Sequence, residues 1–161
     1  MSQEHVETVR QAFEAYQRRD WDGVVRDADP EIEVVQPPDF ADATSYHGHR
    51  GFVEVLRWWP SQWEDFQVEL AEVIDMNEDQ VVWVTRQRGR GKGSGVEVVG
   101  EVAFVSTFRD GKTIRIEMFQ SVREALEAVG GGTRRPHTGA GRASATGPRT
   151  GGAAGLDALR A

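Results

Sequence analysis

The residues best suited to proton transfer near neutral pH are the histidines, and two of the four lie close together. His47 and His49 flank Gly48 in a polar stretch, and Tyr46 directly precedes them. Two imidazoles two residues apart, with no third ligand nearby, make a poor metal site, so we expect no bound metal. His47 and Tyr46 remain as the candidate catalytic residues, because an imidazole or a phenol can donate or accept a proton.

A glycine-rich stretch at 89–95 lacks the spacing of a phosphate-binding loop. No Gly-Lys-Ser or Gly-Lys-Thr closes it, and the sequence after it is typical of a strand. We therefore predict a hairpin loop there and expect no cofactor. A basic cluster beside it (Arg86, Arg88, Arg90 and Lys92) could steer an anionic ligand, although a solvated strand end is the simpler interpretation. The absence of cysteine excludes a disulfide framework, a thiolate zinc site and a cysteine nucleophile.

The charge and hydropathy of the chain exclude several classes of protein. It has 161 residues and a formal net charge of −7, and residues 1–129 hold 14 basic and 25 acidic side chains, a balance of −11. An acidic domain argues against nucleic acid as a partner. The apolar runs are too short for a membrane helix, and the polar N-terminal segment does not resemble a signal peptide. We therefore expect a cytoplasmic protein with no membrane partner.

The composition of the chain changes at Gly130. The segment 130–161 holds 9 of the 18 glycines and five arginines, and it has no Val, Ile, Phe or Trp. A segment so poor in apolar groups cannot offset the entropy lost when it becomes ordered. We therefore predict one folded domain over 1–129 and a disordered tail, rich in Gly, Ala and Arg, over 130–161.

Apolar residues at three- and four-residue spacing predict the helices. These cover 3–18, a short segment around 21–25, 49–59 and 122–129. Asp20 is the expected N-cap of the short helix, and Asp29-Pro30 should stop it. Pro60 should end the third helix, and Gly130 should occupy the C′ position of the last one.

Alternating and β-branched residues predict the strands. These cover 31–35, a segment from Trp63 onward, 81–88, 97–109 and 113–120, whereas 37–48 is expected to be a polar loop. Helices followed by a run of strands indicate an α+β fold. We expect a curved antiparallel sheet wrapped around the N-terminal helices, with a cavity between the two layers.

Five local sequences are distinctive: VRQAFEAY at 9–16, RDWDGVV at 19–25, YHGHRGF at 46–52, TFRDGKTIR at 107–115 and EALEAVG at 124–130. They resemble the nuclear-transport-factor-2-like superfamily, and within it the SnoaL-like and ketosteroid-isomerase-like proteins. The resemblance covers about residues 3–130. It implies a cone-shaped, cystatin-like α+β barrel with one apolar pocket, often in a homodimer packed through the sheet. It does not fix the activity, because the fold serves enzymes and binding modules alike.

The resemblance also permits a test of isomerase activity, residue by residue. Ketosteroid isomerase uses an Asp base and two oxyanion donors, a Tyr and a protonated Asp. The corresponding positions here are Gln36 for the base, Phe13 for the Tyr and Phe104 for the second Asp. None of these side chains can do that chemistry, so we argue against ketosteroid isomerase activity.

The strand register implied by alternation predicts which side chains line the pocket. The expected apolar lining is Phe13, Phe52, Leu56, Trp59, Val98, Val102, Phe104, Ile116 and Met118. Gln36, Ser106 and Gln120 are its polar members. These groups can orient a ligand, but they include no evident general base.

Three functions remain open at this point. The first is a protein that binds a small hydrophobic molecule in the pocket. The second is an isomerase, cyclase or dehydratase that acts on a hydrophobic substrate. The third is an interaction module that uses an exposed apolar sheet face formed by Val99, Ala103, Val105 and Phe119. For that face we favour burial in a homodimer over binding of a different chain.

Overall fold

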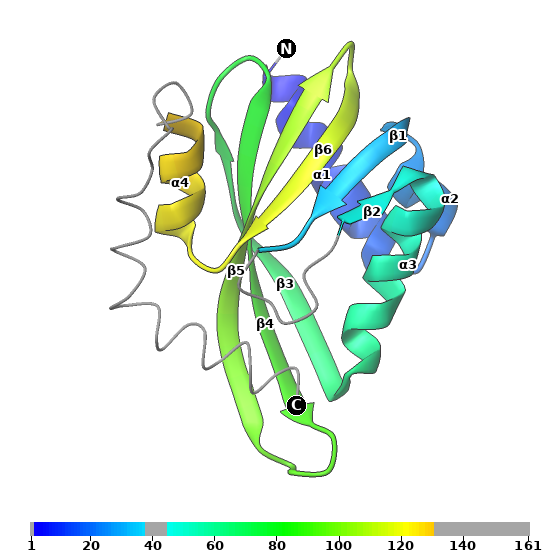
Figure 1. Cartoon of the computed structure of the whole chain (residues 1–161), viewed down its shortest axis with the longest axis vertical. Helices are drawn as coiled ribbons and strands as arrows, with labels where there is room; N and C mark the ends of the chain where they lie inside the picture. The colour runs from blue at the N-terminus through cyan, green and yellow to red at the C-terminus, as the bar shows by residue number, and fades with distance from the viewer. Residues whose placement is uncertain (1, 38–44, 131–161) are drawn as a thin grey trace.

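A single six-stranded sheet organises the part of the chain that the structure describes. The computed structural model describes residues 2–37 and 45–130. Its strands are β1 (Ala28–Val35), β2 (Ser45–His47), β3 (Trp63–Asp75), β4 (Gln80–Gly91), β5 (Glu97–Arg109) and β6 (Lys112–Phe119). They lie in the order β2-β1-β6-β5-β4-β3, and neighbours are antiparallel except for β1 beside β6. The sheet is curved and open, with β2 and β3 at its edges (Figure 1).

Helices cover both faces of this sheet. Three of them, α1 (Ser2–Gln17), α2 (Trp21–Val25) and α3 (Gly48–Ser61), pack on one face, and α4 (Val122–Gly130) packs on the other (Figure 1). Ala15 of α1 and Phe52 of α3 share a buried cluster with Ile32 of β1. As expected, Asp20 caps α2, because its side chain accepts a hydrogen bond from the backbone N–H of Gly23 at 3.1 Å. The predicted α+β fold is confirmed.

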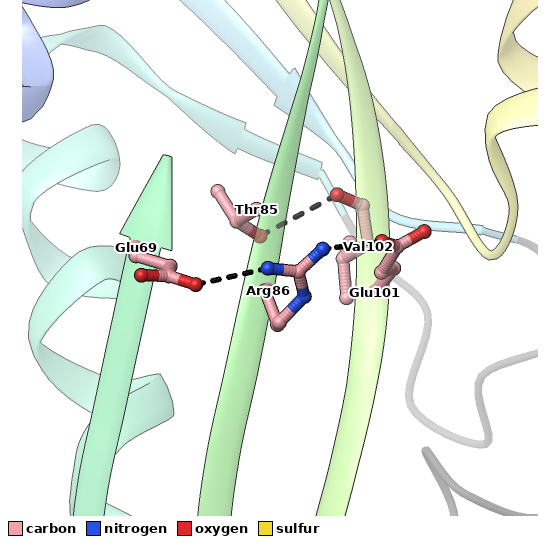
Figure 2. A network of polar contacts seen from close by, with 5 residues as sticks. All are labelled: Glu69, Thr85, Arg86, Glu101 and Val102. Carbon is pink, nitrogen blue, oxygen red and sulfur yellow. Dashed lines mark hydrogen bonds and ion pairs between the residues drawn. The ribbon is translucent and has the colours of Figure 1, made fainter. Parts of the chain in front are cut away.

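Neighbouring residues of β4 point to opposite faces, which separates a buried side from a charged side. Thr85 is buried, and its hydroxyl donates to the carbonyl oxygen of Val102 at 3.4 Å. Arg86 is exposed, and its guanidinium lies between Glu69 on β3 and Glu101 on β5, at 3.1 Å and 3.4 Å (Figure 2). A shift of one residue would move the arginine inward, so the charged row and the buried row together fix the register.

The glycine-rich stretch forms the predicted hairpin between β4 and β5. The N–H of Gly91 donates to the carbonyl oxygen of Val96 at 3.0 Å, which closes the loop. Arg88 pairs with Glu97 at 3.1 Å, and Arg90 pairs with Asp65 at 3.2 Å. Because acidic side chains on the neighbouring strands pair with these arginines, the arginines of the basic cluster form cross-strand ion pairs rather than a free positive patch.

Several element boundaries differ from the prediction. The last three residues before α3, expected in a loop, form β2, which pairs with β1. α2 ends at Val25, and β1 begins before Pro30 because a register shift between β1 and β6 accommodates the proline. Pro60 lies inside α3, one residue before its end, and Gly130 belongs to α4 instead of following it.

The outer face of the sheet is not the open apolar surface predicted from alternation. Ala103 and Val105 are buried beneath α4, in a cluster with Ala125 and Leu126. Val99 remains exposed, and Phe119 packs at the edge of the same cluster. The expected interaction face is therefore partly covered by the chain's own last helix, because α4 is itself amphipathic. The homodimer stays a prediction.

The predicted tail lies outside the described residues, apart from Gly130. The same holds for residues 38–44 of the predicted loop. In the described ranges, no helix combines the length and the apolar composition that a membrane crossing requires.

Ile32→Ala should lower the free energy of unfolding by about 2–5 kcal/mol, because the side chain has no exposed surface and its loss leaves a cavity. Val99→Ala, on the exposed outer face, should change it by less than about 0.5 kcal/mol. Urea denaturation followed by tryptophan fluorescence measures both. Equal losses in the two variants would contradict this division of the sheet faces.

Candidate ligand-binding site

A cavity of about 150 Å³ lies between the three N-terminal helices and the sheet. Its wall is mainly apolar, with Val9 and Phe13 from α1, Val55 from α3 and Trp83 and Phe104 from the sheet. The rings of Trp83 and Phe104 stack, with centroids 4.2 Å apart and planes at 16°. A flat aromatic pair of this kind offers a broad apolar surface to a planar or chain-like molecule.

Ten of the twelve predicted pocket residues lie in the wall of this cavity. They are Phe13, Gln36, Phe52, Leu56, Trp59, Val102, Phe104, Ser106, Ile116 and Met118. Val98 and Gln120 lie outside it. Val98 packs beside Trp63 instead, nearer the hairpin end of β5. Gln120 follows the last residue of β6, where the alternation of the strand no longer sets its direction.

Sequence reasoning missed part of the wall. The missed residues include Tyr16 on α1, Phe66 and Val68 on β3, and Trp83, Thr85 and Gln87 on β4. A signal for them was present, because the three β4 residues alternate in step and Tyr16 follows Phe13 by one helical turn. The alternation that assigned every second residue of β5 to the pocket also applies to β4, and it identifies Trp83, Thr85 and Gln87 as wall residues.

A directed chain of hydrogen bonds fixes one polar side of the cavity. The indole N–H of Trp59 donates to Oε1 of Gln87 at 2.9 Å, and Nε2 of Gln87 donates to Oγ1 of Thr85 at 3.0 Å. The hydroxyl of Thr85 then donates to the carbonyl oxygen of Val102. In this series of hydrogen bonds each group has a fixed role as donor or acceptor, so the side-chain amide of Gln87 is held in one orientation.

Two buried polar side chains keep hydrogen-bonding capacity for a ligand. Ser106 is 2% exposed, and its Oγ accepts from the indole N–H of Trp83 at 2.8 Å, which leaves the hydroxyl proton for another acceptor. Gln36 is 7% exposed and lines the cavity, and no described residue forms a hydrogen bond with its amide. Buried polar groups normally find partners, so these two are suited to a polar atom of a bound molecule.

Tyr16 adds a third polar group to the wall. Burial raises the pKa of its phenol above the usual 10.0, and the positive charge of Arg19 partly offsets this increase. The phenol is therefore protonated at neutral pH, and its O–H can donate a hydrogen bond. None of the described residues accepts that bond.

The structure places the two candidate catalytic residues away from the cavity. His47 precedes α3 with its side chain 63% exposed, and its Nε2 lies 3.9 Å from a carboxylate oxygen of Glu33. Tyr46 packs at the edge of the helix–sheet core, and neither residue is part of the wall. His49 is held by Ala28, whose carbonyl oxygen lies 2.9 Å from its Nε2. This placement argues against either candidate as a base that acts inside the cavity.

Ionisable groups are scarce in the wall. Among its described residues, Asp27 has the one carboxylate and none is a histidine. Arg26 is exposed and Asp27 is half-buried, so both lie toward the rim, where α2 leads into β1. In the described ranges, no three His, Asp or Glu side chains are grouped closely enough to hold a metal ion.

Helices that fill the concave side of a curved sheet, with an apolar cavity between them, define the nuclear-transport-factor-2-like class of domain. The family model described as the SnoaL-like domain matches residues 9–116, and the chain belongs to this family. The resemblance noted in the sequence is confirmed.

Solved structures of low sequence identity share the fold. A nuclear-transport-factor-2-like protein from Burkholderia thailandensis is 25% identical, with a TM-score of 0.64 over 77% of this chain and 95% of that one. TerC, co-crystallised with polyporic acid, is 22% identical, with a TM-score of 0.62 over 77% and 96%. A hypothetical protein with a ketosteroid isomerase-like fold from Catenulispora acidiphila, in complex with trimethylamine, is 14% identical, with a TM-score of 0.59 over 72% and 86%. A comparison with curated proteins gave no match.

The raised pKa of Tyr16 predicts a loss of stability in alkali. Above pH 10.0 the phenol of the unfolded chain ionises while that of the folded chain keeps its proton, so the free energy of unfolding should fall as pH rises through the folded pKa. Ultraviolet titration of the wild type minus Tyr16→Phe isolates this phenol. A midpoint at or below 10.0 would contradict its burial.

Proposed function

We propose that the domain binds a small hydrophobic molecule in the cavity between the helices and the sheet. One observation carries this proposal: a cavity of about 150 Å³ has aromatic and aliphatic walls. An engineered apolar cavity of about that volume in another protein binds benzene. The buried part of the ligand is therefore about the size of one aromatic ring or a short alkyl chain.

The expected affinity follows from the area that such a ligand buries. An aromatic group buries roughly 150–250 Å², which at about 25 cal/mol per Å² corresponds to about 4–6 kcal/mol. That range corresponds to a dissociation constant between about 1 mM and several tens of micromolar. A natural ligand that extends beyond the cavity, or that uses its polar groups, would bind more tightly.

The polar groups of the wall favour an uncharged inner end for the ligand. Ser106 offers a hydroxyl proton, and Gln36 offers both an N–H and a carbonyl oxygen. A carbonyl or hydroxyl group of the ligand matches them. A charged group at this depth would lose its hydration without gaining an opposite charge.

Two of the similar structures hold small molecules, polyporic acid in TerC and trimethylamine in the Catenulispora protein. This supports binding by the fold without naming the ligand of this chain. Phe13, Gln36 and Phe104, at the positions corresponding to ketosteroid isomerase catalytic residues, line the cavity. Because none of them transfers a proton at neutral pH, we propose binding without that isomerase chemistry.

Butylbenzene is a neutral probe with which isothermal titration calorimetry can test the proposal. Ala12→Phe introduces a ring into the wall from α1 and should abolish butylbenzene binding. Glu14→Phe introduces the same ring at an exposed position on the same helix and should leave binding unchanged. Circular dichroism checks that both variants fold.

Two results would count against a ligand cavity. One is a wild-type protein that gives no binding heat with butylbenzene up to its solubility limit. The other is equal binding by the wild type and a folded Ala12→Phe variant, since the probe would then bind somewhere else.

His47→Ala should leave butylbenzene binding unchanged, because the imidazole is mostly exposed and is not part of the wall. The same titration measures this. A loss of binding in a folded His47→Ala variant would place the histidine closer to the ligand than the structure does.

A further inference from the structure

A second cavity of about 460 Å³ adjoins the first. The two share three wall residues, Tyr16, Phe66 and Val68, which lie between them at the end of α1 and on the neighbouring part of β3. The second cavity is open to solvent, since Gln17, Arg19 and Gln67 in its wall are exposed. The second cavity differs in chemistry, because Gln17, Arg19 and other polar residues line it. A ligand too long for the first cavity would therefore enter a polar environment.

Arg19 ends α1 at this junction. Its backbone has φ 60°, in the left-handed region. Its N–H donates to the carbonyl oxygen of Tyr16 at 3.0 Å, and the N–H of Asp20 donates to the carbonyl oxygen of Ala15 at 2.8 Å. These two bonds form the Schellman motif that commonly ends helices, and they fix where the side chain of Arg19 leaves the backbone.

The guanidinium of Arg19 has no acidic partner among the described residues. Its neighbour Arg18 pairs with Asp20 at 3.8 Å, whereas no carboxylate pairs with Arg19. No described residue of the second cavity's wall is acidic. Gln17 lies there too, but its amide already donates to the carbonyl oxygen of Val68 at 2.9 Å. The wall of the second cavity thus has one arginine, which is exposed and has no acidic partner among the described residues.

Arg19 also acts on the phenol that both cavities share. Its charge lowers the pKa of Tyr16, against the effect of burial, so the guanidinium lies within electrostatic range of that hydroxyl. A guanidinium and a protonated phenol that line the same cavity supply several N–H donors and one O–H donor. Carboxylates form strong, charge-assisted hydrogen bonds with such a set.

We propose that the second cavity binds the anionic group of an amphipathic organic acid whose apolar body occupies the first cavity. Arg19 and Tyr16 hold the carboxylate at the junction. This inference rests on the proposed function and adds to it the charge of the ligand. Because residues 1–129 have a balance of −11, a local positive group is needed to hold an anion against the field of the domain.

The test compares two probes with the same body and isosteric ends, 4-butylbenzoate and 4-butylbenzamide. At neutral pH the first has a negative charge and the second has none. Isothermal titration calorimetry should show that the wild type binds the benzoate about threefold to tenfold more tightly than the benzamide. The difference should shrink as the salt concentration rises.

Arg19→Met should abolish this preference by lowering the affinity for the benzoate more than the affinity for the benzamide, because methionine keeps the apolar stem and removes the charge. Arg18→Met is the matched control, since it removes the adjacent arginine, which is not part of either cavity wall. The control should keep the preference.

Each outcome is informative. A wild-type preference that survives in Arg19→Met, or no preference in the wild type, overturns the anion site while butylbenzene binding still supports the proposed function. If Arg19→Met lowers thermal stability but leaves the ratio of benzoate to benzamide affinity unchanged, the arginine only stabilises the C-terminal end of α1, and the inference is wrong. If the wild type binds neither the two probes nor butylbenzene, the proposed function fails and the inference with it.

Discussion

The register of β4 between β3 and β5 is the constraint on which the rest of the structure depends. In this register Thr85 and Gln87 face the helices, and Arg86 and Arg88 face outward to acidic partners. A shift of one residue would bury two guanidinium groups without counter-charges, at a cost of several kcal/mol each, which together is comparable with the stability of a small domain. The ion pairs contribute little one by one, but together with the buried row they exclude the alternative pairing.

Because of the same alternation, the neutral polar groups of the cavity lie deeper than the ionised ones. The Trp59–Gln87–Thr85 chain lies inside, where hydrogen bonds keep every member oriented, and the ionised side chains lie toward the rim or beyond it. Neutral groups can be buried when they are paired, whereas an ionised group cannot be buried cheaply. Under the proposed function, the wall therefore suits a ligand whose buried part is apolar and whose polar atoms lie only where donors are available.

Much of this could be predicted from the sequence, because the signals are local. β5 has its predicted ends, 97–109, since thirteen alternating residues leave little freedom in where a strand begins and stops. β2 has three residues and therefore no period to detect. The candidate base His47 shows a different limit: its chemistry is visible in sequence, but its place outside the cavity wall depends on how α3 and β1 pack. Val98 follows the alternation but lies nearer the hairpin end of β5, beside Trp63, and Gln120 follows the last residue of β6.

The position of Tyr16 shows how a single residue can link two environments. A phenol has an apolar ring and a polar end, so it can belong to an aromatic cluster with Phe13 and Trp21 and still present a hydroxyl at a boundary. Burial keeps that hydroxyl protonated, and the nearby guanidinium of Arg19 makes the surroundings positive. In the proposed complex, the pair at the end of the cavity discriminates between ligands by their charge at one end, while the aromatic wall discriminates by shape. These two selections are independent because they act on different parts of the same molecule.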